Sequence, residues 1–305
     1  SKAVNLLMDK WLGKAIEVLE QLYIQHPSLI GHREFDSIRT DYQLMVDYMG
    51  KGYPDRQRES LYRALLQRLY RVTANLEISW RCKNTGTYID AFRTSDHLNM
   101  SHDLIRTVLE TFVSEVAMLS LRSGAERERR KNELYDRHHQ FVDRLFNALW
   151  TSCQWTDEDS AFYTDLLLSP TIVSSDQQII VSAISMGAMN LFDVNKFKTL
   201  VSVYRRSTDE SVRQRALVGW VLSVFEGMDI FPEQESLVRE LCQDPAVTHE
   251  LLTLQIQFFY SQDAEKDNDK IQRDIMPDLM RSSNLAIGRL GIIEKEDDSI
   301  EHVLH

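Results

Sequence analysis

Glycine and proline are scarce in this chain. Its 305 residues include 11 glycines and 6 prolines, well below the usual shares of about 7% and 5% for these residues. Because glycine and proline supply most sharp turns and interrupt helices, a chain with few of them has few places to reverse direction. The composition therefore favours long helices joined by short connections, and no segment predicts a strand. The fold class that we expect is all-α.

Cysteines are few and long apolar runs are missing. Cys82, Cys153 and Cys242 are odd in number, lie far apart and form no Cys-x-x-Cys pair, so neither a disulfide framework nor a cysteine zinc site is expected. No apolar run reaches the roughly 18 residues of a membrane span, and charge is spread through the first helix-length segment. The expected compartment is the cytoplasm, although a signal segment that had already been removed would leave no trace here.

The short motifs of the common enzyme classes are also missing. The sequence contains no Gly-x-Gly-x-x-Gly, no phosphate-binding lysine loop, no Gly-x-Ser-x-Gly and no His-Glu-x-x-His. We therefore expect no bound cofactor and assign no residue a catalytic role. These absences favour a non-catalytic protein and leave the question of enzymatic activity open.

Charge is unevenly distributed along the chain. Residues 1–150 hold 22 Lys and Arg against 20 Asp and Glu, a net charge of +2, whereas residues 151–305 hold 13 against 26, a net charge of −13. An acidic half is a poor partner for nucleic acid and favours a basic protein or peptide. The segment Arg122–Lys131 is a small basic patch that could bind nucleic acid weakly. Glu126 and Glu128 interrupt it, which is more typical of a solvated helix start.

Residues 1–153 predict a helical N-terminal region of about five helices. Apolar residues at steps of three or four between Leu61 and Leu76 show the 3.6-residue period of a helix. Glycine and proline in the segment 50–55 separate this helix from the one before it. The five predicted helices end near Tyr23, span Phe35 to Met49, reach from after Asp55 to at least Trp80, begin near Ser101, and span Asn132 to Trp150.

Residues 154–290 contain a repeat. Three segments open with an aspartate and run into an apolar helix, and aligning Asp176, Asp209 and Asp244 gives offsets of 33 and 35 residues. A repeat of this period is typical of a helical solenoid, in which each helix pair buries its apolar face by stacking on its neighbours. We expect each aspartate to cap its helix. The acidic residues 291–305 predict a tail or linker.

The middle copy of this repeat resembles a known family. "DESVRQRAL", Asp209 to Leu217, is similar to the second helix of a HEAT repeat, in which Asp-x-x-Val-Arg-x-x-Ala is the common core; Asp209, Val212, Arg213 and Ala216 fill its four positions. The resemblance implies that Asp209 and Arg213 form a hydrogen-bonded ladder between repeats. The flanking copies have Ile180 and Thr248 at the arginine position. The segment Phe258–Ser283 also looks like part of large bacterial helical-repeat proteins of unknown function, often described as tetratricopeptide-repeat proteins.

Histidines supply the candidates for chemistry. At 100° per residue, His138 lies within the apolar arc of its predicted helix, whereas His139 lies about 100° further round, towards Asp143. Adjacent helical residues do not face each other, so these two histidines are poorly placed to bind one ion. We expect His138 to be a core histidine with one hydrogen-bond partner, and His139 to pair with Asp143. His97, His102 and Asp103 form a second small group in a loop and helix start.

Taken together, the sequence predicts an α-α superhelix with HEAT-like helix pairs in its second half and long helices before them. The expected function is a non-catalytic scaffold that binds a protein or peptide on a curved helical surface. One alternative is a helical metal-dependent hydrolase that uses a His/Asp cluster drawn from the histidines above. A second is weak nucleic-acid binding through Arg122–Lys131. The oligomeric state is left open.

Overall fold

A computed structural model describes residues 2–52, 56–119, 121, 124–227, 229–270, 273, 285–288 and 291–294. The chain divides into two compact units, Ser1–Arg239 and Glu240–His305, which are described separately. Thirteen helices and one short hairpin are present in the described residues. The first unit is entirely helical where it is described, which confirms the predicted all-α character of that part of the chain.

Seven helices precede residue 153 among the described residues, and they include the five that the sequence predicts. The first predicted helix is broken in two near Lys10, which adopts a left-handed backbone with φ of 59°. The other additional helix follows its neighbour after a single extended residue, Thr85. The seven helices are α1 (Lys2–Met8), α2 (Leu12–Gln25), α3 (His32–Gly50), α4 (Arg58–Asn84), α5 (Gly86–Ser95), α6 (His102–Leu119) and α7 (Gly124–Trp150).

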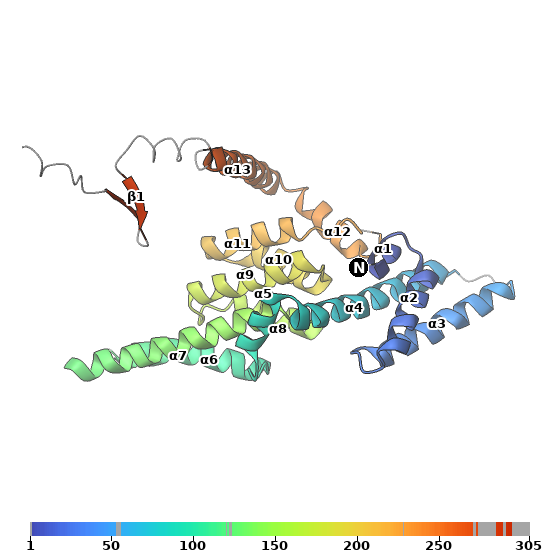
Figure 1. Ribbon diagram of the computed structural model, residues 1–305, viewed down its shortest axis with the longest axis horizontal. Coiled ribbons are helices and arrows are strands. Elements are labelled where there is room, and N and C mark those ends of the chain that lie inside the picture. The colour runs from blue at the N-terminus through green and yellow to red at the C-terminus, as the bar shows by residue number, and fades with distance from the viewer. Residues whose placement is uncertain are drawn as a thin grey trace, which may run out of the picture. The chain divides into compact units, whose positions relative to one another are not determined.

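Helices of the repeat region form two layers in the first unit (Figure 1). One layer stacks α9 (Ser174–Asn190) on α11 (Glu210–Leu222), and α7 packs on the other side of α9. The second layer places α8 (Asp157–Leu167) beside α10 (Val194–Arg206). Helices packed against one another in this way are compatible with a helical-repeat fold. The boundary between the two units falls near the end of α12 (Pro232–Leu241).

The second unit contains α13 (Pro245–Lys270) and the hairpin of β1 (Leu285–Gly288) and β2 (Gly291–Glu294). The two strands are antiparallel, with Leu285 opposite Glu294 and Gly288 opposite Gly291. The sequence analysis predicted no strand in this region. Four-residue segments are too short for an apolar period to distinguish strand from helix, but their β-branched isoleucines favour strands.

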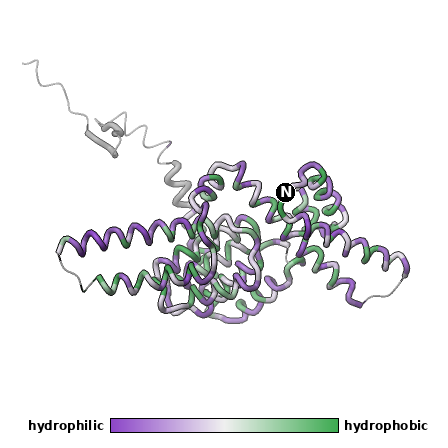
Figure 2. Tube along the Cα trace, turned by 90° about the horizontal axis from the view of Figure 1, so that it is seen from below, coloured by the Kyte–Doolittle hydropathy of each residue, from purple (hydrophilic) through white to green (hydrophobic). Residues whose placement is uncertain are grey.

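Aromatic rings join α4 to the repeat region. Tyr70 on α4 lies with its ring centroid 5.1 Å from that of Phe231 and 5.5 Å from that of Phe225. Phe192, between α9 and α10, stacks on Phe225 at 5.1 Å. Tilted and edge-to-face arrangements at these distances are favourable for aromatic rings. Figure 2 shows hydrophobic and hydrophilic residues alternating along the helices of the first unit, as amphipathic helices require.

A buried polar network fixes the connection between α7 and α8. The Asp193 carboxylate accepts a hydrogen bond from the backbone N–H of Trp155 at 2.7 Å and from the N–H groups of Asn195 and Lys196 at 2.9 and 3.2 Å. It therefore caps α10 and holds the preceding connection at the same time. The Lys196 ammonium is 98% buried, donates to the Ser152 carbonyl at 3.2 Å and lies 3.8 Å from Asp193.

Burial and charge act in opposite directions on Lys196. Burial lowers the pKa of its ammonium below the usual value, and the nearby Asp193 carboxylate raises it, with burial the larger effect. A lysine whose pKa is lowered on folding contributes stability above its unfolded pKa and loses it as pH falls. At neutral pH the charge on Lys196 therefore counts against the folded state.

We predict unequal losses for substitutions of these two partners. Lys196→Met relieves the burial of the ammonium but leaves the Asp193 carboxylate without its cation, with its three backbone N–H donors still in place, and should lower the free energy of unfolding at pH 7 by about 1–3 kcal/mol. Asp193→Ala removes three hydrogen bonds and leaves a buried ammonium without its carboxylate, and should lower it by about 3–5 kcal/mol. Urea unfolding followed by circular dichroism measures both. Equal losses in the two variants would contradict this account of Lys196.

Candidate protein-binding groove

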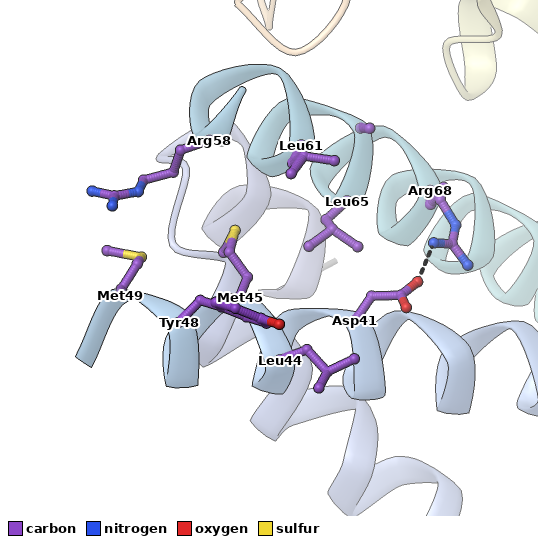
Figure 3. A pocket seen from close by; sticks show the side chains of 10 residues that line it. Asp41, Leu44, Met45, Tyr48, Met49, Arg58, Leu61, Leu65 and Arg68 are labelled. Carbon is purple, nitrogen blue, oxygen red and sulfur yellow. Dashed lines mark hydrogen bonds and ion pairs between the residues drawn. The ribbon is translucent and has the colours of Figure 1, made fainter. Parts of the chain in front are cut away.

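The second half of α3 and the first half of α4 enclose an apolar groove of about 730 Å³ (Figure 3). The two helices are antiparallel neighbours in the chain and pack directly on each other. Lining positions recur every three or four residues on both helices, which places them on one face of each. The lining residues are Asp41, Leu44, Met45, Tyr48 and Met49 from α3 and Arg58, Leu61, Ala64, Leu65 and Arg68 from α4.

The groove forms because neighbouring helices bury only the first half of α3. In the first half of α3, Phe35 and Ile38 are buried at 1% and 0% exposure, and Tyr23 of α2 packs on Phe35 with ring centroids 4.9 Å apart. In the second half, Leu44 and Tyr48 are 53% and 62% exposed. The apolar surface of α3 thus continues past the end of its cover.

The α4 wall combines buried and exposed leucines. Leu65 is 5% exposed and belongs to the core, whereas Leu61, one turn earlier, is 47% exposed. Met45 points toward these leucines from α3, and Met49 lies below Arg58 at the end of the groove (Figure 3). Methionine side chains are flexible and adapt to differently shaped apolar partners. The groove is therefore an apolar surface that is partly formed and accessible.

An ion-pair cluster closes one end of the groove. The Arg68 guanidinium donates to Glu34 and to Asp41, each at 2.7 Å, and to the Ser37 hydroxyl at 2.9 Å. The hydrogen bond to Glu34 is the largest of the effects that together raise the pKa of Arg68 above its usual value, and partial burial opposes it. Arg58 lies at the opposite end (Figure 3).

His138 occupies the core position that its helical direction predicts. Its side chain is 4% exposed, its Nε2 atom lies 2.7 Å from Oδ2 of Asp176, and its ring stacks on Phe112 with centroids 3.6 Å apart. The expectation of a buried histidine with a hydrogen-bond partner is confirmed. The partner was not expected, because Asp176 was predicted to cap α9. That helix begins at Ser174, which places Asp176 in its first turn, where its carboxylate reaches α7.

His139 and Asp143 are both exposed on α7, as predicted. The expected pairing between them does not form. The His139 ring stands edge-on to Tyr135 with centroids 6.0 Å apart, and the Asp143 side chain lies 3.5 Å from the amide of Asn147. The i,i+4 spacing brought the two residues to the same face, but each finds a closer neighbour on that face.

The remaining histidines lie in separate places. His102 lies 3.1 Å from the Asp159 carboxylate of α8 and stacks on Phe162 at 4.0 Å, which joins α6 to α8. His97 is 91% exposed beside Asp96, and Asp103 is exposed in the first turn of α6. Within the described part of the chain, no three histidine, cysteine, aspartate or glutamate side chains converge in a metal-binding arrangement.

Two of the three repeat aspartates cap their helices as predicted. Asp209 accepts from the N–H of Val212 at 3.0 Å at the start of α11, and Asp244 accepts from the N–H of Ala246 at 2.9 Å at the start of α13. A hydrogen bond from the Ser174 hydroxyl is the largest of the causes that lower the pKa of Asp209. Because Ser174 begins α9, this bond joins α9 to α11.

An arginine outside the HEAT-like pattern, Arg215, joins α11 to α9. Arg213 binds Glu210 in its own helix, at 2.9 and 3.0 Å. Arg215 instead reaches from α11 to Gln178 and Ser182 of α9, at 3.1 and 2.9 Å. The other two pattern positions, Val212 and Ala216, are fully buried, as a repeat core requires.

Two basic residues at the start of α7 pair within their own helix. Arg129 binds Glu133 at 2.8 Å, and Lys131 lies 4.0 Å from Glu128. Arg122 lies outside the described residues. Intrahelical pairs of this kind are typical of a solvated helix surface, as the interleaved glutamates indicated.

The sequence analysis did not identify the α3–α4 groove. A signal was present, because α3 carries apolar residues both at Phe35, Ile38 and Met45 and at Leu44 and Tyr48. These two sets lie on neighbouring faces, so the apolar surface of α3 is wider than a single packed neighbour needs. Which part of α3 stays uncovered depends on how far α2 extends along it in the folded structure. The periodic pattern of α3 alone does not contain that information.

We predict that His138 and Asp176 are energetically coupled. His138→Leu leaves the Asp176 carboxylate buried without its partner, and should lower the free energy of unfolding by about 2–5 kcal/mol. The double variant His138→Leu/Asp176→Leu should lose less stability than the sum of the losses in the two single variants, because it contains no unpaired buried carboxylate. His139→Leu, on the exposed side of the same helix, is the control and should change stability by no more than about 0.5 kcal/mol. Additive losses would show that the pair is not coupled.

The groove surface and the core should also respond differently to the same substitution. Leu61→Ser should change the free energy of unfolding by no more than about 1 kcal/mol, because much of this side chain is already in water. Leu65→Ser, one turn further along α4, should cost about 2–5 kcal/mol. Thermal or urea unfolding distinguishes the two. A large loss in Leu61→Ser would mean that Leu61 belongs to the core and that the groove is not a free surface.

Comparison with known proteins adds no relative. No protein-family model, no curated protein and no solved structure matches this chain. No helix in the described residues is long and apolar enough to cross a membrane.

Proposed function

We propose that this protein is a non-catalytic scaffold that binds another protein or a peptide, and that the α3–α4 groove is one of its binding sites. The observation that carries the proposal is the half-exposed apolar surface of Leu44, Tyr48 and Leu61, which lines one groove. Exposed apolar surface gathered in one place is a common mark of protein interaction sites.

The groove suits a protein partner better than a substrate. Small-molecule and catalytic sites usually combine an apolar cavity with a few polar groups directed at the ligand. Here Asp41 and Arg68 bind each other at the groove's end, and no histidine or cysteine lines it. The walls offer apolar contact and no obvious acid, base or nucleophile.

The repeat region supports the scaffold part of the proposal. Stacking of α9 on α11 and of α8 beside α10 is what two successive HEAT-like pairs would produce, and the capping by Asp209 and the burial of Val212 and Ala216 support the proposal. We propose that these pairs are part of a HEAT-like α-solenoid within a larger helical-repeat protein. The net charge of −13 over residues 151–305 favours a basic partner segment on that part.

Site-specific photo-cross-linking tests the proposal. A photoreactive amino acid in place of Leu61 should give a discrete cross-linked product in cells that express the protein. The matched control is Leu222, which is 45% exposed against 47% for Leu61 but lies outside the groove. Cross-linking at Leu61 should also fall in an Ala64→Trp variant, in which the added indole fills the groove. Equal yields at Leu61 and Leu222, or no product at Leu61, would contradict a groove-specific partner.

A further inference from the structure

One side of α4 holds the connection between α7 and α8. Arg71, Asn75 and Cys82 share this side, because steps of four and seven residues return to nearly the same direction of a helix. The Asn75 side chain accepts a hydrogen bond from the backbone N–H of Gln154 at 2.8 Å. The Arg71 guanidinium donates to the backbone carbonyl of Trp155. The connection therefore runs along the side of α4 that carries Cys82.

A second cysteine lies within this connection. Cys82 is buried in an apolar cluster with Trp150, the last residue of α7. Cys153 follows three residues later and immediately precedes Gln154, which Asn75 holds. The segment that carries Cys153 is thus fixed to the Cys82 side of α4 both before and after this cysteine.

The two thiols are also electrostatic neighbours. Burial raises the pKa of Cys82 above its usual value, and the nearby Cys153 raises it further. Partial burial raises the pKa of the Cys153 thiol as well, and the Lys196 ammonium opposes that increase. Because the thiolate is the reactive form of cysteine, both thiols react slowly at neutral pH and faster as pH rises.

The cysteines differ in their access to solvent. Cys153 is exposed, whereas Cys82 is 9% exposed and belongs to the core. A small oxidant therefore reaches Cys153 first. An exposed thiol beside a second, less exposed one is the usual arrangement of a cysteine that is oxidised and then resolved as a disulfide.

We propose that Cys82 and Cys153 form a disulfide when the folded protein meets hydrogen peroxide. Peroxide oxidises the Cys153 thiolate to a sulfenic acid and releases hydroxide. The Cys82 thiolate then attacks the Cys153 sulfur, the S–S bond forms, and the sulfenic oxygen leaves as a second hydroxide. The protons of the two thiols convert both hydroxides to water, so two thiols are oxidised and one peroxide is reduced to two waters.

The disulfide joins α4 covalently to the connection that leads into the repeats. It is a modification that responds to oxidant and is distinct from a permanent structural framework, which agrees with the rule that disulfides in reducing compartments are mostly transient. The proposal involves neither wall residues nor a partner of the α3–α4 groove, so its outcome does not bear on the proposed binding function.

Oxidation of the folded, reduced protein tests the proposal. The full chain is treated with hydrogen peroxide, its remaining thiols are blocked, and it is digested after glutamate residues without reductant. Mass spectrometry should find the Cys82 peptide joined to the Cys153 peptide, and reductant should separate them. A disulfide requires two Cα atoms within about 7 Å of each other, so this product reports directly on the contact. Its initial rate should rise about tenfold from pH 7 to pH 8.

Serine variants assign the two roles. Cys242→Ser, which removes the exposed cysteine of the second unit, is the control and should give the same product as the unchanged chain. Cys82→Ser should leave Cys153 as a sulfenic acid, which dimedone traps. The oxidised chain should unfold at a higher urea concentration than the reduced chain, because a cross-link restricts the unfolded state. Peroxide should cause no such increase in Cys153→Ser.

Four outcomes would overturn the proposal. Unreacted thiols after peroxide treatment would show that Cys153 is not oxidised. Equal dimedone trapping of Cys153 in the unchanged chain and in Cys82→Ser would show that Cys82 does not resolve it. A cross-link to Cys242 in place of Cys82 would assign a different partner. A product that forms only in urea would belong to the unfolded chain. Three of these results come from the unchanged chain, so they stand even where Cys82→Ser does not fold.

Discussion

The arrangement of the first unit depends most on the hydrogen bonds that the buried Asp193 carboxylate accepts. This carboxylate bonds backbone N–H groups from two places, the connection after α7 and the start of α10. The same connection is bound from α4, because Asn75 accepts from the N–H of Gln154 at 2.8 Å and Arg71 donates to the Trp155 carbonyl. One short segment therefore joins the long helices to the repeats, at positions far apart in the chain.

Helix packing in the first unit is close between α9 and α11, whereas the second half of α3 is largely exposed. A Cβ added at Gly219 of α11 would lie 2.1 Å from the Ser185 hydroxyl of α9, so the absence of a side chain is what lets the two helices approach. In α3, the Tyr42 hydroxyl makes a similar close approach to Gly13 of α2, where an added Cβ would lie at 2.7 Å, but from Gln43 onward almost every side chain is exposed. Close packing holds α4 in place, and α4 in turn presents one fixed wall of the groove.

Local features were predictable from the sequence and long-range ones were not. The apolar period gave α3, α4, α6 and α7, the helical wheel gave the inward direction of His138, and the capping preference of aspartate gave the role of Asp209. The same methods missed α5, which only a single extended residue, Thr85, separates from α4. They also did not identify Arg215 as a residue that reaches α9, because that contact depends on which helix packs beside α11.

The candidate site was missed for the same kind of reason. A periodic pattern shows which residues of α3 are apolar, but the number of them that stay exposed is decided by helix lengths. The helix α2 has 14 residues and α3 has 19, so α3 is longer than its cover. Asp176 is a further case, since its buried partner His138 lies 38 residues away in the chain.

The energetics of the groove indicate that it does not act alone. Fully burying a large apolar side chain contributes about 1.5–3 kcal/mol, and Leu44, Tyr48 and Leu61 each have about half of that left to gain. Three apolar anchors from a bound partner segment would bring the gross gain to about 7–13 kcal/mol, against an association cost of about 4–15 kcal/mol. A partner that contacts the groove alone is thus expected to bind weakly. Strong binding needs a second contact on the same partner, because a tethered second site adds affinity through effective concentration. A scaffold with several stacked helices can provide that second contact, whereas an isolated α3–α4 pair cannot.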